Sequence, residues 1–234
     1  MVIATDMGNL IGNGGVDKVT LTGVKQPNSE FIEQITLVIE GEKTRNLIKV
    51  SPPQNAGYSP TIFVGDFTGD GVDDVLLQIE SGGSGAITFD YIYTFKDNNT
   101  KMLFNFDQYN KEFEYEIEYL DYYTVEAVSE NNRTRYLINL SFKGKDYLDE
   151  IYTENGKLKE EIDGFVNPLS ALFPIDADSD GVYELMAFQK ISGRYDADSL
   201  GYFQNFLRWD RNKFRLVNQY VGIMGKEMIY TPRR

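Results

Sequence analysis

The sequence predicts an all-β fold, specifically a small β-propeller of about four repeats, and three observations support this prediction. Strand-like runs rich in β-branched and aromatic residues recur along the 234 residues, bounded by Gly, Asn, Asp and Pro. Long amphipathic helical patterns are missing. Two similar Asp- and Gly-rich stretches begin at Asp66 and Asp176, which is two steps of a repeat of roughly 55 residues. A β-sandwich would need similar strands, but it does not require the repeat.

The chain is expected to form one repeat domain with approximate repeats at residues 1–60, 61–120, 121–170 and 171–234. Each repeat reads as a loop, a strand, a longer connection, a strand, a tight turn and a strand. In the third repeat the turn is Asn155-Gly156, a strong hairpin signal. The expected strands are residues 19–22, 35–39 and 46–50; 75–79, 87–95 and 101–106; 136–140, 151–153 and 157–158; and 185–188, 206–209 and 214–217.

The two Asp-rich stretches carry the clearest chemical signal. In the first, Asp66, Thr68, Asp70 and Asp74 place oxygen atoms at nearly every second position around Gly71. Such alternation around a sharp turn suits a hard cation of the size of Ca²⁺. An EF-hand is excluded, because the twelfth residue of each stretch is apolar and lies in a strand-like run. The second stretch offers the carboxylates of Asp176, Asp178, Asp180 and Glu184.

The first and third repeats are expected to keep the fold without the metal. The segment Gly12–Val19 aligns with Thr68–Val75, so that Gly14 replaces Asp70 and Lys18 replaces Asp74. The third repeat shows only an Asn131-Asn132 turn and no series of carboxylates. A separate segment, residues 112–119, alternates apolar and acidic residues and is expected to form an outer strand with a charged face that discourages edge pairing.

Composition excludes several function classes. The net charge of −13 argues against nucleic acid as a partner, since phosphate binding needs clustered Lys and Arg. The chain has no Cys and no His, which removes thiolate sites, the commonest general base and every Ser-His or Cys-His pair. No apolar run is long enough to span a membrane. No signal peptide is visible at Met1–Asp6, and we expect that the chain begins inside a longer protein.

The segment Gly65–Val75, together with Asp176–Leu185, resembles the calcium loop of FG-GAP/VCBS repeats, which build the integrin α type of β-propeller and many secreted bacterial proteins. The hairpin Trp209–Phe214 is similar to one that often follows such loops. Thr68 departs from the usual Asp or Asn, so the first site would have one charge fewer. The resemblance implies Ca²⁺ sites with these ligands: Asp66, Thr68, Asp70, Asp74 and the Val72 carbonyl; and Asp176, Asp178, Asp180, Glu184 and the Val182 carbonyl.

The sequence together with this resemblance therefore predicts a non-enzymatic, calcium-stabilised binding or adhesion module, extracellular or at the cell surface, with a protein or glycan ligand. One alternative is a carbohydrate-active enzyme that uses paired carboxylates, although no pair is singled out by the sequence. Another is a purely structural surface or coat protein. For both loops a further interpretation is a tight turn held by Asp side chains without metal.

Overall fold

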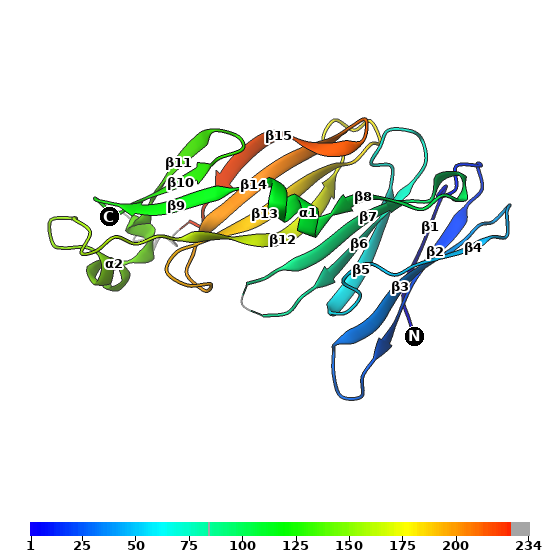
Figure 1. Cartoon of the computed structure of the whole chain (residues 1–234), viewed down its shortest axis with the longest axis horizontal. Coiled ribbons are helices and arrows are strands. Elements are labelled where there is room, and N and C mark those ends of the chain that lie inside the picture. Colours follow the sequence, from blue (N-terminus) through cyan, green and yellow to red (C-terminus); the bar gives the residue numbers. More distant parts are fainter. Residues whose placement is uncertain (84, 226–234) are drawn as a thin grey trace, which may run out of the picture. The chain divides into compact units, whose positions relative to one another are not determined.

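The computed structural model describes residues 1–83 and 85–225 and shows an all-β protein of four antiparallel sheets, none of them closed (Figure 1). The chain divides into two compact units. Unit 1 comprises residues 1–112, 168–188 and 204–219, and unit 2 the remainder. Among the described residues, no helix has the length and apolar character needed to cross a membrane.

Unit 1 contains two complete four-stranded sheets, each with its strands in chain order, and parts of a third. Such meanders follow from runs of β-branched residues separated by short turns. In the first sheet the strands are β1 (Val2–Gly8), β2 (Asp17–Lys25), β3 (Ile32–Glu40) and β4 (Leu47–Val50). In the second they are β5 (Tyr58–Gly65), β6 (Asp74–Glu80), β7 (Thr88–Thr94) and β8 (Lys101–Asn105), followed by α1 (Phe106–Glu112).

The sheet formed by the last four strands contributes residues to both units. It again has its strands in chain order. They are β12 (Phe165–Ile175), β13 (Glu184–Ser192), β14 (Ser199–Asp210) and β15 (Lys213–Gly222).

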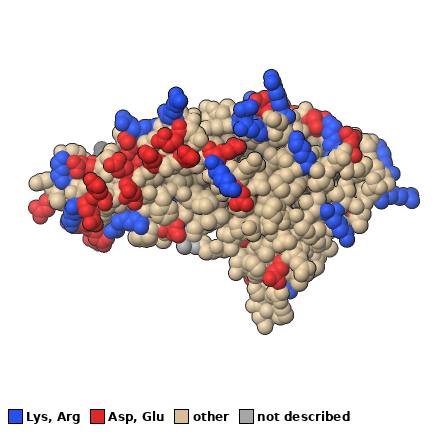
Figure 2. Space-filling model, viewed as in Figure 1, with Lys and Arg blue, Asp and Glu red and all other residues tan. Residues whose placement is uncertain are grey.

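Unit 2 contains a three-stranded sheet with the order β11-β10-β9 and a short helical segment. On the edge strand β9, Ile117 and Tyr119 are buried, whereas Glu116 and Glu118 are exposed. The predicted strand with an acidic face is present, but it begins at Tyr115 rather than at residue 112, and its outer edge is hydrogen-bonded to residues 162–164. Acidic side chains gather toward the left end of Figure 2. The elements are β9 (Tyr115–Leu120), β10 (Thr124–Ser129), β11 (Thr134–Asn139), the 3₁₀ turn η2 (Leu140–Lys143) and α2 (Lys145–Ile151).

Most predicted strands are present, but the two predicted at residues 151–153 and 157–158 are wrong. Residues 151–153 were expected to form a strand, but Ile151 ends helix α2 and only an isolated bridge joins Tyr152 to Leu158. The helix buries Ile151 in the core of unit 2. The tight Asn155-Gly156 turn is kept, and Gly156 has the positive φ of 74° that this turn requires.

Candidate metal centre

Each four-stranded sheet carries a nine-residue loop from its first strand to the first residue of its second, and the three loops share two internal hydrogen bonds. We call them loop one (Asn9–Asp17), loop two (Asp66–Asp74) and loop three (Asp176–Glu184), and number their positions 1 to 9. The predicted ligands therefore occupy positions 1, 3, 5, 7 and 9 of loops two and three.

Position 1 folds the loop over itself. In all three loops its side-chain oxygen accepts a hydrogen bond from the backbone N–H of position 6, which is a glycine each time. A short Asp or Asn side chain forms this kind of turn readily. The donor and acceptor residues are Gly71 and Asp66 (2.8 Å), Gly181 and Asp176 (3.1 Å), and Gly14 and Asn9 (3.1 Å).

Position 5 makes a second turn of the same type. Its side-chain oxygen accepts from the backbone N–H of position 7. Loop one again uses an amide where the other loops use a carboxylate. The donor and acceptor residues are Val72 and Asp70 (3.0 Å), Val182 and Asp180 (2.8 Å), and Gly15 and Asn13 (2.9 Å).

Position 9 is the first residue of the second strand, and its carboxylate turns back to the start of the loop. Asp74 accepts from the Phe67 N–H and Glu184 from the Ala177 N–H, both at 3.2 Å. In loop one the corresponding acid is the fully buried Asp17, which accepts from the Ile11 N–H at 2.9 Å.

The predicted alignment of loop one was therefore wrong by one residue. Asn13 and Asp17 stand where Asp70 and Asp74 stand in loop two, rather than Gly14 and Lys18. The shift arose because the similar Gly-Val-Asp strings were matched, whereas the hydrogen bonds of the loop are set by the position of the turn glycine.

The three loops form a ladder through one repeated contact. The position 1 carbonyl of one loop accepts from the position 8 N–H of the next: Asn9 from Asp73 at 3.1 Å, and Asp66 from Tyr183 at 2.8 Å. A glycine, Gly8 or Gly65, precedes position 1 in the two accepting loops. A Cβ on Gly65 would lie 2.8 Å from the Tyr183 ring, so the close approach requires glycine.

Loop three brings carboxylates together. Ligand oxygens of Asp176, Asp178 and Asp180 all lie within 4.8 Å of one another. Arg208 approaches from β14 and contacts Glu184 at 2.8 Å and Asp178 at 3.5 Å. No ion pair to Asp180 is present in the described part of the chain.

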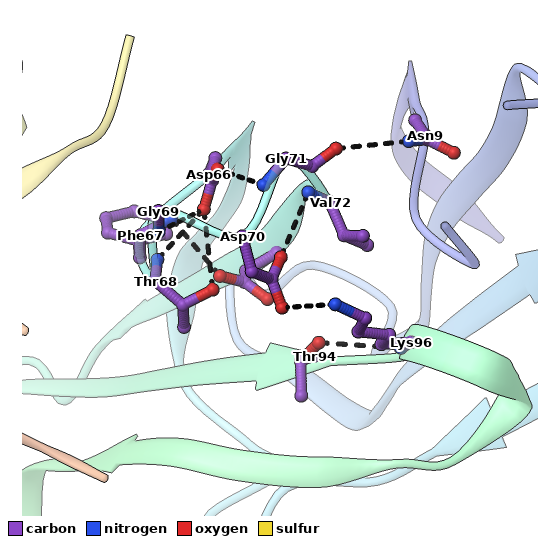
Figure 3. A network of polar contacts seen from close by, with 11 residues as sticks. Asn9, Asp66, Phe67, Thr68, Gly69, Asp70, Gly71, Val72, Thr94 and Lys96 are labelled. Carbon is purple, nitrogen blue, oxygen red and sulfur yellow. Dashed lines mark hydrogen bonds and ion pairs between the residues drawn. The ribbon is translucent and has the colours of Figure 1, made fainter. Parts of the chain in front are cut away.

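Loop two contains four acids, and Lys96 forms an ion pair with one of them, Asp70, as Figure 3 shows. Lys96 Nζ lies 2.8 Å from Asp70 Oδ2. Asp74 is 1% exposed, and its Oδ1 makes no hydrogen bond to the described residues. Burial raises the pKa of Asp74 to about 7, although the Phe67 hydrogen bond and the Thr94 side chain act to lower it, and the charges of Asp66 and Asp70 raise it further.

Thr68, the remaining side chain predicted as a ligand, has its hydroxyl 3.4 Å from Asp66 Oδ1. The two predicted carbonyl ligands belong to residues whose N–H groups complete the position 5 turns, Val72 and Val182. Sequence reasoning missed the two basic side chains, Lys96 and Arg208. A usable signal for Lys96 was its place in the turn after the third strand, where Lys43 stands in the first sheet.

Relatives of the chain are known by sequence. A family model described as the YybI C-terminal domain matches residues 113–222. The uncharacterized protein YybI of Bacillus subtilis (strain 168) is 40% identical over 227 residues, which cover 97% of this chain and 87% of that protein. No solved structure matches. With this identity over almost its whole length, the chain belongs to the YybI family.

Proposed function

We propose that this protein is a non-enzymatic, calcium-binding β-repeat module, in which Ca²⁺ at loops three and two ties the end of one strand to the start of the next. The observation that carries the proposal is the difference in charge between loops of equal geometry. Loop one makes the position 1 and position 5 turns with Asn9 and Asn13, at distances within 0.3 Å of those in loop two. Carboxylates are therefore not needed for the turns.

A second argument comes from the cost of gathering like charges. Carboxylates that converge repel one another, and the repulsion destabilises the fold unless a cation offsets it. Loop three has Asp at positions 1, 3 and 5 and Glu at position 9, and only two of these four acids contact Arg208. If the loops were only turns without metal, these additional carboxylates would have no role, because the amides of loop one are sufficient to form the same turns.

The donor set also fits the ion. Ca²⁺ prefers six to eight oxygen ligands drawn from carboxylates, carbonyls and water. Asp176, Asp178, Asp180, Glu184 and the Val182 carbonyl would hold the ion in loop three. In loop two the buried Asp74 Oδ1 makes no hydrogen bond to the described residues. A bound metal ion would supply the positively charged partner that this buried oxygen lacks.

The experiment is a thermal or urea unfolding measurement with EDTA, with Mg²⁺ and with Ca²⁺. We expect Ca²⁺ to stabilise the wild type by about 2.7 kcal/mol when the free ion is a hundredfold above its dissociation constant. Asp180→Asn is the sharpest variant, because an amide at position 5 keeps the turn in loop one. It should fold in EDTA and lose most of the response to Ca²⁺.

The matched control is Asp6→Asn, which removes one exposed acid whose carboxylate accepts a hydrogen bond from the adjacent Met7 N–H. It should respond to Ca²⁺ like the wild type. An unfolding curve of the wild type that is the same in EDTA and in excess Ca²⁺ would refute the proposal.

The wider part of the proposal is a propeller-like module that binds a protein or glycan outside the cell or at its surface. It is supported by three four-stranded meanders in chain order, as propeller blades are, and by the resemblance of the loops to FG-GAP/VCBS repeats. We expect solution scattering to give a radius of gyration of about 17 Å, which is the value for a compact chain of this length. Glycan-array binding without turnover would support a binding role, and cleavage of a bound glycan would contradict it.

A further inference from the structure

Lys96 is held in place by the neighbouring loop. It opens the short 3₁₀ turn η1 (Lys96–Asn98) between β7 and β8. The N–H of the next residue, Asp97, donates to the Ile11 carbonyl of loop one at 3.0 Å, and Asn98 accepts a hydrogen bond from the Asn46 side chain at 3.0 Å. The turn is thus fixed to the first sheet, and from it the Lys96 side chain reaches Asp70 at position 5 of loop two.

The first sheet has a corresponding lysine, although position 5 of its loop is not an acid. Lys43 lies in the turn between β3 and β4, and its Nζ donates to the Asn13 carbonyl, also at position 5, at 2.9 Å. The basic residue near loop three, Arg208, lies instead on a strand and contacts positions 9 and 3. An ammonium group directed at position 5 is therefore shared by loops one and two.

Lys96 neutralises only part of loop two. The loop contains Asp66, Asp70, Asp73 and Asp74, and the lysine forms an ion pair with Asp70. Asp74, although 1% exposed, keeps one oxygen without a hydrogen bond to the described residues. In loop two, the buried Asp74 therefore favours a further cation, whereas Lys96 already forms an ion pair with Asp70, which is one of the proposed ligands.

We propose that Lys96 is a built-in competitor of the metal at loop two, so that Ca²⁺ binds there only when the lysine releases Asp70. This inference rests on the proposed calcium function. Loop three, whose Asp180 forms no ion pair within the described residues, fills first, and loop two fills at a higher concentration that Lys96 sets. Because the two loops are joined by the hydrogen bond from Tyr183 to Asp66, filling loop three also holds the first ligand of loop two in place.

The experiment is calorimetric titration of Ca²⁺ into the full chain and into Lys96→Met, which keeps the length and apolar stem of the side chain and removes its charge. Lys43→Met is the matched control, since it changes the net charge equally at the corresponding place of loop one. Each substitution is also made together with Asp180→Asn, which isolates loop two.

We expect Lys96→Met to strengthen binding at loop two by about tenfold or more, the scale expected when a unit charge close to a divalent ion is removed. Lys43→Met should leave the affinity within about twofold. Folding of each variant is checked by its unfolding curve in EDTA, and Lys96→Gln replaces Lys96→Met if the latter does not fold.

The outcomes separate the two ideas. If neither the wild type nor any variant binds Ca²⁺, both the proposed function and this inference fail. If Ca²⁺ binds at two sites and Lys96→Met changes the affinity no more than Lys43→Met does, the calcium function stands and competition by Lys96 is refuted.

Discussion

Asp90 is a buried carboxylate whose ionisation should lower the stability of the fold. It lies on β7, is fully buried, and stands opposite Gln78 of β6. Gln78 Nε2 donates to Asp90 Oδ1 at 2.9 Å and to the Leu172 carbonyl at 2.7 Å, and the Thr88 hydroxyl donates to Asp90 Oδ2 at 2.5 Å. Burial raises the pKa of Asp90 to about 6, although both hydrogen bonds act to lower it.

The size and sign of the effect follow from this shift. The pKa rises from 3.8 in the unfolded chain to about 6 in the fold, and each unit is worth about 1.4 kcal/mol, so the total is about 3 kcal/mol. Between these two values the unfolded chain loses its proton while the folded chain keeps it. The contribution of Asp90 to stability is therefore complete below pH 4 and is lost as the pH rises through 6.

Asp90→Asn isolates this contribution. The asparagine oxygen can accept from Gln78, and its amide can donate to the Thr88 hydroxyl, which is free to rotate and act as acceptor. The variant minus wild-type difference in the free energy of unfolding should therefore rise by about 3 kcal/mol from pH 4 to pH 7 in urea titrations. All other titrating groups are common to both proteins and cancel. A difference that is constant over this range would refute the reasoning.

Two further variants test packing and a buried ion pair by urea unfolding. Gly65→Ala places a Cβ 2.8 Å from the Tyr183 ring and should cost about 1–3 kcal/mol, whereas Gly225→Ala, with open space around its Cβ, should cost nothing. Asp198→Ala leaves the Lys143 side chain, 16% exposed, without its carboxylate partner and should cost about 3–5 kcal/mol. Equal losses for Gly65→Ala and Gly225→Ala, or a loss below 1 kcal/mol for Asp198→Ala, would contradict these arguments.

Local features could be predicted from the sequence because they are determined by residues that are close together along the chain. The Asp-x-x-x-Asp-Gly spacing at Asp66 and Asp176 indicates both loops, since each side chain bonds to an N–H two to five residues further on. The acidic-apolar alternation around Ile117 likewise specifies an edge strand. In contrast, the segment at Ile151 is apolar and short, and only its packing in the core of unit 2 decides that it ends a helix.

The contacts of the basic side chains with the loops could not be derived from neighbouring residues, because these side chains come from distant segments. Lys96 is 26 residues from Asp70 along the chain, and its direction depends on a turn held by loop one. Asp198 lies in the segment Asp196–Ser199, whose sequence repeats the Asp-Ala-Asp-Ser of loop three. In the structure it is buried, and it bonds to Lys143 and to the Tyr147 hydroxyl at 2.8 Å. The sequence around a single acid in a connecting segment does not indicate which distant side chains will bond to it.

The loop ladder also explains why the repeats are not equivalent. Gly8 and Gly65 stand before loops one and two, and each admits the position 8 residue of the following loop, Asp73 or Tyr183. Before loop three the corresponding residue is Ile175, which is not a glycine and carries a branched side chain. At the opposite end, the position 8 N–H of loop one donates to the Glu42 side chain at 2.8 Å instead of to a preceding loop. The ladder is therefore directional, and a side chain closes it at loop one. Loop one contains a single acid, Asp17, whereas loops two and three contain four acids each.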